Sequence, residues 1–223
     1  MVVSLPTSGV AVVSDSGAGR VFLTVVDDLR YVPLAQAVAS QLAQTVRSVL
    51  VASAPVTTET WESLSESLSA VLKELGVRQV SLIGFGGGAT LAQNLALAQP
   101  KLVRILAVVD ASSRPHPTKW ERLVDGIEEN LPFGLPLRLG TRSFNIKSYV
   151  HRLRCPLLVV GTKRAGAFVR SELESVSRLA PTAWHVMVVH DDTERESNEL
   201  AATILAFHDI PAKCPQKNNV VAV

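Results

Sequence analysis

The sequence has little cysteine. Among its 223 residues there are two, Cys155 and Cys214, too few for the disulfide framework on which small secreted domains rely. Cys155 precedes an apolar run, so we predict that its thiol is buried, whereas Cys214 lies in a polar tail. The scarcity of cysteine favours a reducing compartment, and we expect a cytoplasmic protein.

The sequence also lacks an excess of one charge. Its 22 Lys and Arg and 20 Asp and Glu are interspersed and leave a net charge of +2. Without a basic stripe or an acidic tail, we expect no nucleic-acid partner. No Lys or Arg precedes Arg20, and Pro6 and Asp15 interrupt the apolar residues at the start. The start of the chain therefore predicts no secretory leader.

A membrane-spanning run is missing as well. Residues 81–100 are uncharged and long enough to cross a bilayer, but they include three consecutive glycines and the amides Gln93, Asn94 and Gln99. We therefore expect a soluble protein without a membrane span. Apolar residues make up 47% of the chain and charged residues 19%. This composition supports one sizeable core, which we place in a single domain over residues 1–208.

The sequence does contain an alternation of short apolar runs with longer segments of helical period. This alternation is typical of a mainly parallel sheet with helices on both faces. The predicted strands are 9–14, 20–26, 47–53, 79–85, 103–110, 156–162 and 184–189. The predicted helices are 31–46, 57–76 (capped by Thr57 or Thr58 and ended by Gly76), 88–98, 168–179 and 193–208.

Residues 111–154 interrupt this rhythm. They contain four prolines, a helix opened by Thr118 with Glu121 three residues later (a capping box), and a second short helix near 144–152. Residues 209–223 predict a flexible C-terminal tail.

Three stretches carry a resemblance to a known family: "LGVRQVSLIGFGGGATLAQNLALAQPKLVRILAVVDAS", "LRCPLLVVGT" and "PTAWHVMVVHDDTERESNELAATILAFH". They resemble the nucleophile strand and turn, the strand before the catalytic acid, and the histidine loop of the α/β-hydrolase superfamily. The resemblance covers roughly residues 9–208. It implies that residues 111–154 form a reduced version of the family's cap.

The family's nucleophile turn reads G-x-S-x-G, whereas this chain reads Gly84-Phe85-Gly86-Gly87-Gly88. Gly86 therefore stands where the family has its nucleophile, and it has no side chain that could attack a substrate. That position requires a positive φ, which costs other residues about 1–3 kcal/mol and glycine little. The resemblance thus implies that Gly86 keeps the conformation of the turn but provides no nucleophile.

Two further functional positions of the family also differ. The acid position falls near Arg164 or Ala165, neither of which can orient an imidazole as a carboxylate does. The oxyanion loop carries Asp27 and Asp28, whose charges would oppose a developing oxyanion. His190 alone matches its family role. We interpret the chain as a degenerate family member, a pseudoenzyme that lacks the nucleophile and the acid.

Asp110, at the end of its strand, is an alternative orienting acid. It also belongs to a second pattern, because Gly84, Gly86 and Ala89 satisfy the G-x-G-x-x-A fingerprint of a Rossmann domain with Asp110 on the ribose. That fingerprint usually opens its fold, whereas this one lies in mid-chain. Nucleotide binding therefore ranks below a tight turn that needs glycine.

The remaining candidates lie around the cleft in which the family has its active site. Phe85, Gly87, Asp110 and Trp120 are the candidate ligand-binding residues. Trp120 begins an apolar series in the cap segment, which either covers the cleft, lines an apolar pocket or presents an interaction surface. The members of this series are Trp120, Leu123, Ile127, Leu131, Phe133 and Leu135.

The strand ends should bring His190, Asp191 and Asp192 near Asp27, Asp28 and Gly86. A histidine with several carboxylates could hold a divalent cation. Acidic loop residues are more often simply solvated, so we expect neither a metal nor a cofactor.

The leading hypothesis is a catalytically inactive α/β-hydrolase-fold protein that acts by binding. Its most plausible role is a structural or regulatory subunit, with protein partners or self-association. One alternative is a non-catalytic binder of a small apolar molecule in the old cleft. Another is an enzyme with non-hydrolytic proton transfer at His190, partnered by Asp27 or Asp28. The last is a nucleotide-binding Rossmann-like domain.

Overall fold

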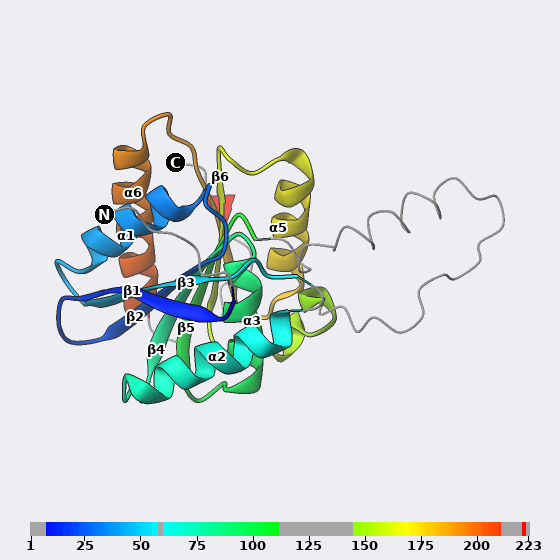
Figure 1. Ribbon diagram of the computed structural model, residues 1–223. Helices are drawn as coiled ribbons and strands as arrows, with labels where there is room; N and C mark the ends of the chain where they lie inside the picture. Colours follow the sequence, from blue (N-terminus) through cyan, green and yellow to red (C-terminus); the bar gives the residue numbers. More distant parts are fainter. Residues whose placement is uncertain (1–7, 58–59, 112–144, 211–219, 222–223) are drawn as a thin grey trace.

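The computed structural model describes residues 8–57, 60–111, 145–210 and 220–221. At its centre lies an eight-stranded sheet in the order β1-β3-β2-β4-β5-β6-β7-β8 (Figure 1). β1 pairs antiparallel with β3, and every other neighbouring pair is parallel. The predicted class, a mainly parallel α/β sheet, is confirmed.

The strands are β1 (Val10–Ser16), β2 (Val21–Val26), β3 (Arg47–Ser53), β4 (Val80–Phe85), β5 (Val103–Val109), β6 (Leu157–Thr162), β7 (Ala183–Val188) and β8 (Val220–Val221). The helices are α1 (Val32–Leu42), α2 (Trp61–Glu74), α3 (Gly88–Ala98), α5 (Ala167–Leu179) and α6 (Thr193–Asp209), with the 3₁₀ turns η1 (Ile146–Ser148) and η2 (Val150–Arg152).

Helices cover both faces of the sheet. α1 and α6 pack against each other on one face, while α2, α3 and α5 lie over the other (Figure 1). Successive strand residues point to opposite faces, so Leu23 and Val25 join the core beneath α2, α3 and α5. Phe22 and Val26 join the core beneath α1 and α6. This double burial explains why the strands read as continuous apolar runs.

Two helix boundaries differ from the predicted ones by four residues. α1 ends at Leu42 rather than at residue 46, and a turn follows in which the Val46 N–H donates to the Leu42 carbonyl at 2.9 Å. α2 begins at Trp61 with Thr60 at its N-cap position, so the predicted cap at Thr57 is wrong; the Thr57 N–H donates to Thr60 Oγ1 at 3.0 Å. The alternative cap, Thr58, lies outside the described residues. At both ends the residues outside the helix form hydrogen-bonded turns, which the sequence pattern does not distinguish from helix.

The predicted end of α2 at Gly76 is confirmed. Gly76 has φ +64°, a conformation that glycine adopts without steric cost. Its N–H donates to the Lys73 carbonyl at 3.0 Å, and the Val77 N–H donates to the Leu72 carbonyl at 3.2 Å. These are the two bonds of a Schellman motif, which satisfies the last carbonyls of the helix.

The helix predicted near 144–152 consists of the two short turns η1 and η2. The Thr118 helix, the Trp120 series and Cys214 lie outside the described residues, so the cap prediction stays a prediction. In the predicted tail, Asp209 belongs to α6 and Val220–Val221 pairs with β7, while residues 211–219 lie outside the described part. Among the helices described, none is long and apolar enough to cross a membrane.

Cys155 is buried before β6, as predicted, and burial raises the pKa of its thiol to about 11.

Because the thiolate is the reactive species, we expect Cys155 in a Cys214→Ser variant to react with Ellman's reagent roughly 100-fold more slowly at pH 8 than in urea. Reaction of the folded variant at the unfolded rate would contradict the burial of this thiol.

Candidate functional site

The turn between β4 and α3 has the shape of a nucleophile elbow. Gly86 has φ +57°, within the left-handed region that costs a residue with a side chain about 1–3 kcal/mol. Its N–H donates to the Val109 carbonyl at the end of β5 at 3.0 Å. α3 begins two residues later at Gly88. The predicted positive-φ turn at Gly86 is therefore present.

Close packing explains two of the neighbouring glycines. A Cβ on Gly84 would lie 2.3 Å from the Cα of Ala89, and a Cβ on Gly88 would lie 2.6 Å from the carbonyl oxygen of Val25. Real Cβ atoms do not approach other atoms so closely. These glycines allow α3 to start directly against β4 and β2, so the glycine run has a structural reason without any phosphate.

The space in front of the elbow is filled by side chains of the chain itself. A Cβ on Gly86 would lie 3.1 Å from Cδ2 and Cε2 of the buried Tyr31 ring. A Cβ on Gly87 would lie 2.1 Å from Oδ2 of Asp27. Tyr31 and Asp27 thus occupy the volume next to the position where the family has its nucleophile. No signal in the sequence points to Tyr31, because a tyrosine at the start of a helix has no distinctive pattern.

Asp27 follows β2, and its carboxylate binds two backbone N–H groups. Oδ1 accepts from the Gly88 N–H at 2.9 Å and Oδ2 from the Val56 N–H at 3.2 Å. The side chain is buried, with 3% of the residue exposed. Helix N-termini attract anions through free N–H groups and the helix dipole. Asp27 is therefore a built-in anion at the N-terminus of α3.

Asp28 has a different environment from its neighbour. Its carboxylate forms an ion pair with Arg30 Nη2 at 2.6 Å, and its carbonyl accepts from the Tyr31 N–H at 3.0 Å. The Arg30 side chain is largely exposed. The two adjacent acids thus differ. Asp27 lies against Gly87 and Gly88 of the elbow, and Asp28 lies in a surface ion pair.

Asp110 is buried at the end of β5 with φ +49°. Its Oδ1 accepts from the Thr162 N–H at 2.7 Å and its Oδ2 from the Thr162 hydroxyl at 2.5 Å. Burial raises the pKa of Asp110, and the bonds from Thr162 partly oppose that rise. Burial and the negative charge of Asp110 raise the pKa of Tyr31, whose hydroxyl therefore keeps its proton. Asp110 joins β5 to β6 beneath the elbow.

His190 lies in the loop between β7 and α6, and its Nε2 bonds to Glu199 of α6. Asp191 pairs with Lys163, which lowers the pKa of the Asp191 carboxyl. Asp192 caps α6 by accepting from two backbone N–H groups of its first turn at 3.3 Å each. The histidine's carboxylate partner is thus Glu199, not an acid of the β2 loop. The described contacts of His190, Asp191 and Asp192 are thus with Glu199, Lys163 and the first turn of α6, and not with Asp27 or Asp28 as expected.

At the expected acid position, Arg164 forms an ion pair with Glu196 of α6. Arg164 Nη2 also donates to Thr193 Oγ1 at 3.3 Å, and Ala165 is buried. The loop after β6 therefore offers no carboxylate of its own to a histidine. Across the described ranges, no three His, Cys, Asp or Glu side chains form a group that could hold a metal ion.

The candidate ligand-binding residues lie in separate environments. Phe85 is fully buried, with its ring centroid 6.4 Å from that of Tyr31. Gly87 is covered by the Asp27 carboxylate. Asp110 lies beneath the elbow, as described above, and Trp120 lies outside the described residues. None of the three described candidates is exposed.

Removing the Asp27 carboxylate should destabilise the protein. In Asp27→Ala two buried N–H groups lose a charged acceptor, and we expect a loss of about 3 kcal/mol in the free energy of unfolding. Asp27→Asn keeps one acceptor and should lose about half as much. The measurement is urea denaturation followed by circular dichroism.

The matched control is Asp191→Asn. Asp191 forms an exposed pair with Lys163, and such pairs contribute little to stability because solvent screens them. Equal losses in the Asp27 and Asp191 variants would contradict the role assigned to the Asp27 carboxylate.

No protein-family model matches the chain, and no curated protein is similar to it in sequence. Solved structures are similar in fold. A hydrolase from Pseudomonas aeruginosa PA01 has a TM-score of 0.63 and 17% identity over 90% of this chain and 94% of its own. Est816, described as degrading N-acyl homoserine lactones, has a TM-score of 0.66 and 15% identity over 89% and 96%.

An enol-lactonase from Burkholderia xenovorans LB400 is similar too, with a TM-score of 0.60 and 13% identity over 89% of this chain and 95% of its own. At such identities the likeness shows the fold alone. The chain has the α/β-hydrolase fold, and its topology agrees with the resemblance found in the sequence.

Proposed function

We propose that this protein is not a serine hydrolase and acts by binding, as a structural or regulatory subunit of a protein assembly. The observation that carries the proposal is the filled elbow. Gly86 provides no nucleophile, and Tyr31 and Asp27 occupy the adjacent space. A fold does not dictate an activity, since the activity depends on the residues at the site.

Electrostatics at the elbow supports the same proposal. In serine hydrolases, backbone N–H groups near the start of this helix stabilise the oxyanion of the reacting carbonyl. In this chain the residue after the nucleophile position is Gly87. The Asp27 carboxylate accepts from the next N–H, that of Gly88, and so places a negative charge beside the oxyanion donor rather than on it. A second anion next to this carboxylate would be repelled, because like charges in a buried site interact strongly.

The contacts also weigh against two of the alternatives, proton transfer at His190 and nucleotide binding at the elbow. His190 bonds to Glu199 rather than to Asp27 or Asp28, which weakens the case for proton transfer between them. The N-terminus of α3, where a Rossmann domain binds its pyrophosphate, holds Asp27 instead. A ligand phosphate would have to displace this internal carboxylate.

A fluorophosphonate probe, read by intact mass, tests the absence of a nucleophile. We expect no labelling of the unmodified protein and none of Gly86→Ser. The serine would be crowded by Tyr31 at 3.1 Å, and its backbone strain would cost about 1–3 kcal/mol. Gly86→Ser with Tyr31→Ala removes the crowding but keeps Asp27, and it too should stay unlabelled.

An active serine hydrolase of this fold, labelled in parallel, shows that the probe is competent. Labelling of the unmodified protein would mean that a nucleophile exists elsewhere and would overturn the proposal. Labelling of a Gly86→Ser protein alone would show that the rest of the site is intact, contrary to the electrostatic argument.

The subunit role predicts that the chain is part of a larger particle. In lysate from its native source, prepared at physiological salt, it should elute from size exclusion well above its own 23.9 kDa. The purified chain is run separately to distinguish self-association from a different partner. Elution of the native chain as a 23.9 kDa monomer would contradict the subunit role.

A further inference from the structure

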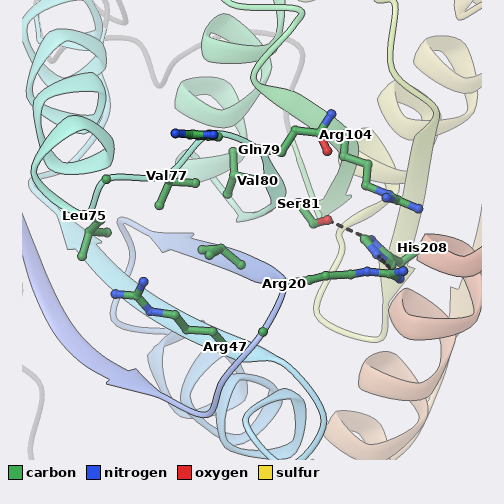
Figure 2. A pocket seen from close by; sticks show the side chains of 13 residues that line it. Arg20, Arg47, Leu75, Val77, Gln79, Val80, Ser81, Arg104 and His208 are labelled. Carbon is green, nitrogen blue, oxygen red and sulfur yellow. Dashed lines mark hydrogen bonds between the residues drawn. The ribbon is translucent and has the colours of Figure 1, made fainter.

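A second site lies at the opposite edge of the sheet. The elbow is at the carboxyl end of β4, whereas a pocket of about 300 Å³ opens at the amino ends of β2, β3, β4 and β5. Four arginines line it: Arg20, Arg47, Arg78 and Arg104. Figure 2 shows Arg20 and Arg104 converging beside His208, with Leu75 and Val77 on the other side.

The strand order explains why these arginines meet. β3, β2, β4 and β5 are consecutive neighbours in the sheet. Arg47 is the first residue of β3, Arg20 directly precedes β2, Arg78 lies two residues before β4, and Arg104 is the second residue of β5. Each strand thus contributes one arginine at the same edge. These arginines are far apart in the sequence and form no basic run, so the sequence alone does not indicate that they cluster.

Part of this positive charge has no counterpart among the residues that the structure describes. Asp15 pairs with Arg47 at 2.6 Å, and Asp209 lies 3.4 Å from Arg20. Arg78 and Arg104 form no hydrogen bond or ion pair with any residue in the part of the chain that the structure describes, and both are exposed. The pocket therefore presents two guanidinium groups available to an external anion.

Buried polar groups position one of the arginines. His208 is buried, with Nδ1 2.9 Å from Ser81 Oγ and Nε2 3.2 Å from Arg20 Nη1. A guanidinium only donates, so Nε2 accepts and Nδ1 carries the proton that is donated to Ser81. Burial and the positive charges of Arg104 and Arg20 lower the pKa of His208, while Asp209 raises it. The neutral ring thus orients Arg20.

Helix ends alone do not explain the cluster. α2 ends beside the pocket, and helix C-termini attract cations. However, its carbonyls at Leu72 and Lys73 are already bonded to the N–H groups of Val77 and Gly76. Neither Arg78 nor Arg104 caps a helix end among the described residues. Within the described residues, neither an acidic side chain nor a helix end therefore pairs with these two arginines.

We propose that this pocket binds a small organic phosphate, with the phosphate on the arginines and the carbon body against Leu75, Val77 and Val80. The planar fork of a guanidinium matches phosphate oxygens in pairs. A volume of about 300 Å³ lies at the small end of the range for ligand pockets and is too confined for a folded macromolecule. The proposal is independent of whether the elbow is catalytic.

The test uses pyrophosphate and fructose 1,6-bisphosphate as probes, with citrate as the carboxylate comparison, in calorimetric titrations of the full chain at constant ionic strength. We expect both phosphates to bind more tightly than citrate. Arg78→Gln and Arg104→Gln should each weaken phosphate binding about tenfold. Arg178→Gln is the matched control, because Arg178 is an exposed arginine paired with Glu174 on α5. The affinity of this variant for both phosphates should equal that of the unmodified protein.

Amide chemical shifts locate the bound phosphate. Saturating pyrophosphate should move the signals of Gly19, Gly76 and Ser81, which line the pocket, and leave Gly86 unmoved. Equal weakening in the Arg178 control, shifts at Gly86 instead, or unaltered affinity in the pocket variants would overturn the proposal. Tighter binding of a single-stranded oligonucleotide that displaces pyrophosphate would also overturn it, in favour of a nucleic-acid surface.

Discussion

The contact between the Asp27 carboxylate and the start of α3 determines what the elbow can do. In a parallel α/β sheet the helix N-termini gather at the carboxyl ends of the strands and create an anion-binding edge. Asp27 uses that capacity internally, through the Gly88 and Val56 N–H groups. It thereby ties the β2 loop, the β3–α2 connection and the α3 N-terminus together. Under the proposed function, the contact that stabilises this part of the fold also opposes an oxyanion beside the elbow.

Much of the fold could be predicted from the sequence, because strand burial and helix periodicity are local signals. α3 was predicted with both boundaries correct, and Gly76 was identified as a helix end because glycine alone tolerates its conformation easily. The errors lie at helix ends, where local side-chain contacts replace helical bonds. The Thr57 N–H donates to Thr60 Oγ1 ahead of α2, a contact that helical propensity does not indicate.

The candidate site was less predictable than the fold. Gly86 could be located because an elbow has a fixed motif and a positive φ. The roles of Tyr31 and Glu199 could not, since each meets its partner across elements: Tyr31 covers Gly86 from the start of α1, and Glu199 reaches His190 from α6. Asp27 was recognised as an opposing charge, but not as a ligand of α3, because two backbone N–H groups are invisible in a sequence.

The two edges of the sheet differ in the charged side chains that meet them. At the carboxyl edge, where helix dipoles favour a bound anion, an internal carboxylate already meets the N-terminus of α3. At the amino edge, where helix C-termini disfavour anions, four neighbouring strands contribute arginines, of which Arg78 and Arg104 have no acidic partner among the described residues. Guanidinium charges are full charges, whereas helix ends carry about half a charge each. The charge of the arginines therefore exceeds that of the helix ends at the amino edge, which is where the proposed phosphate site lies, opposite the elbow.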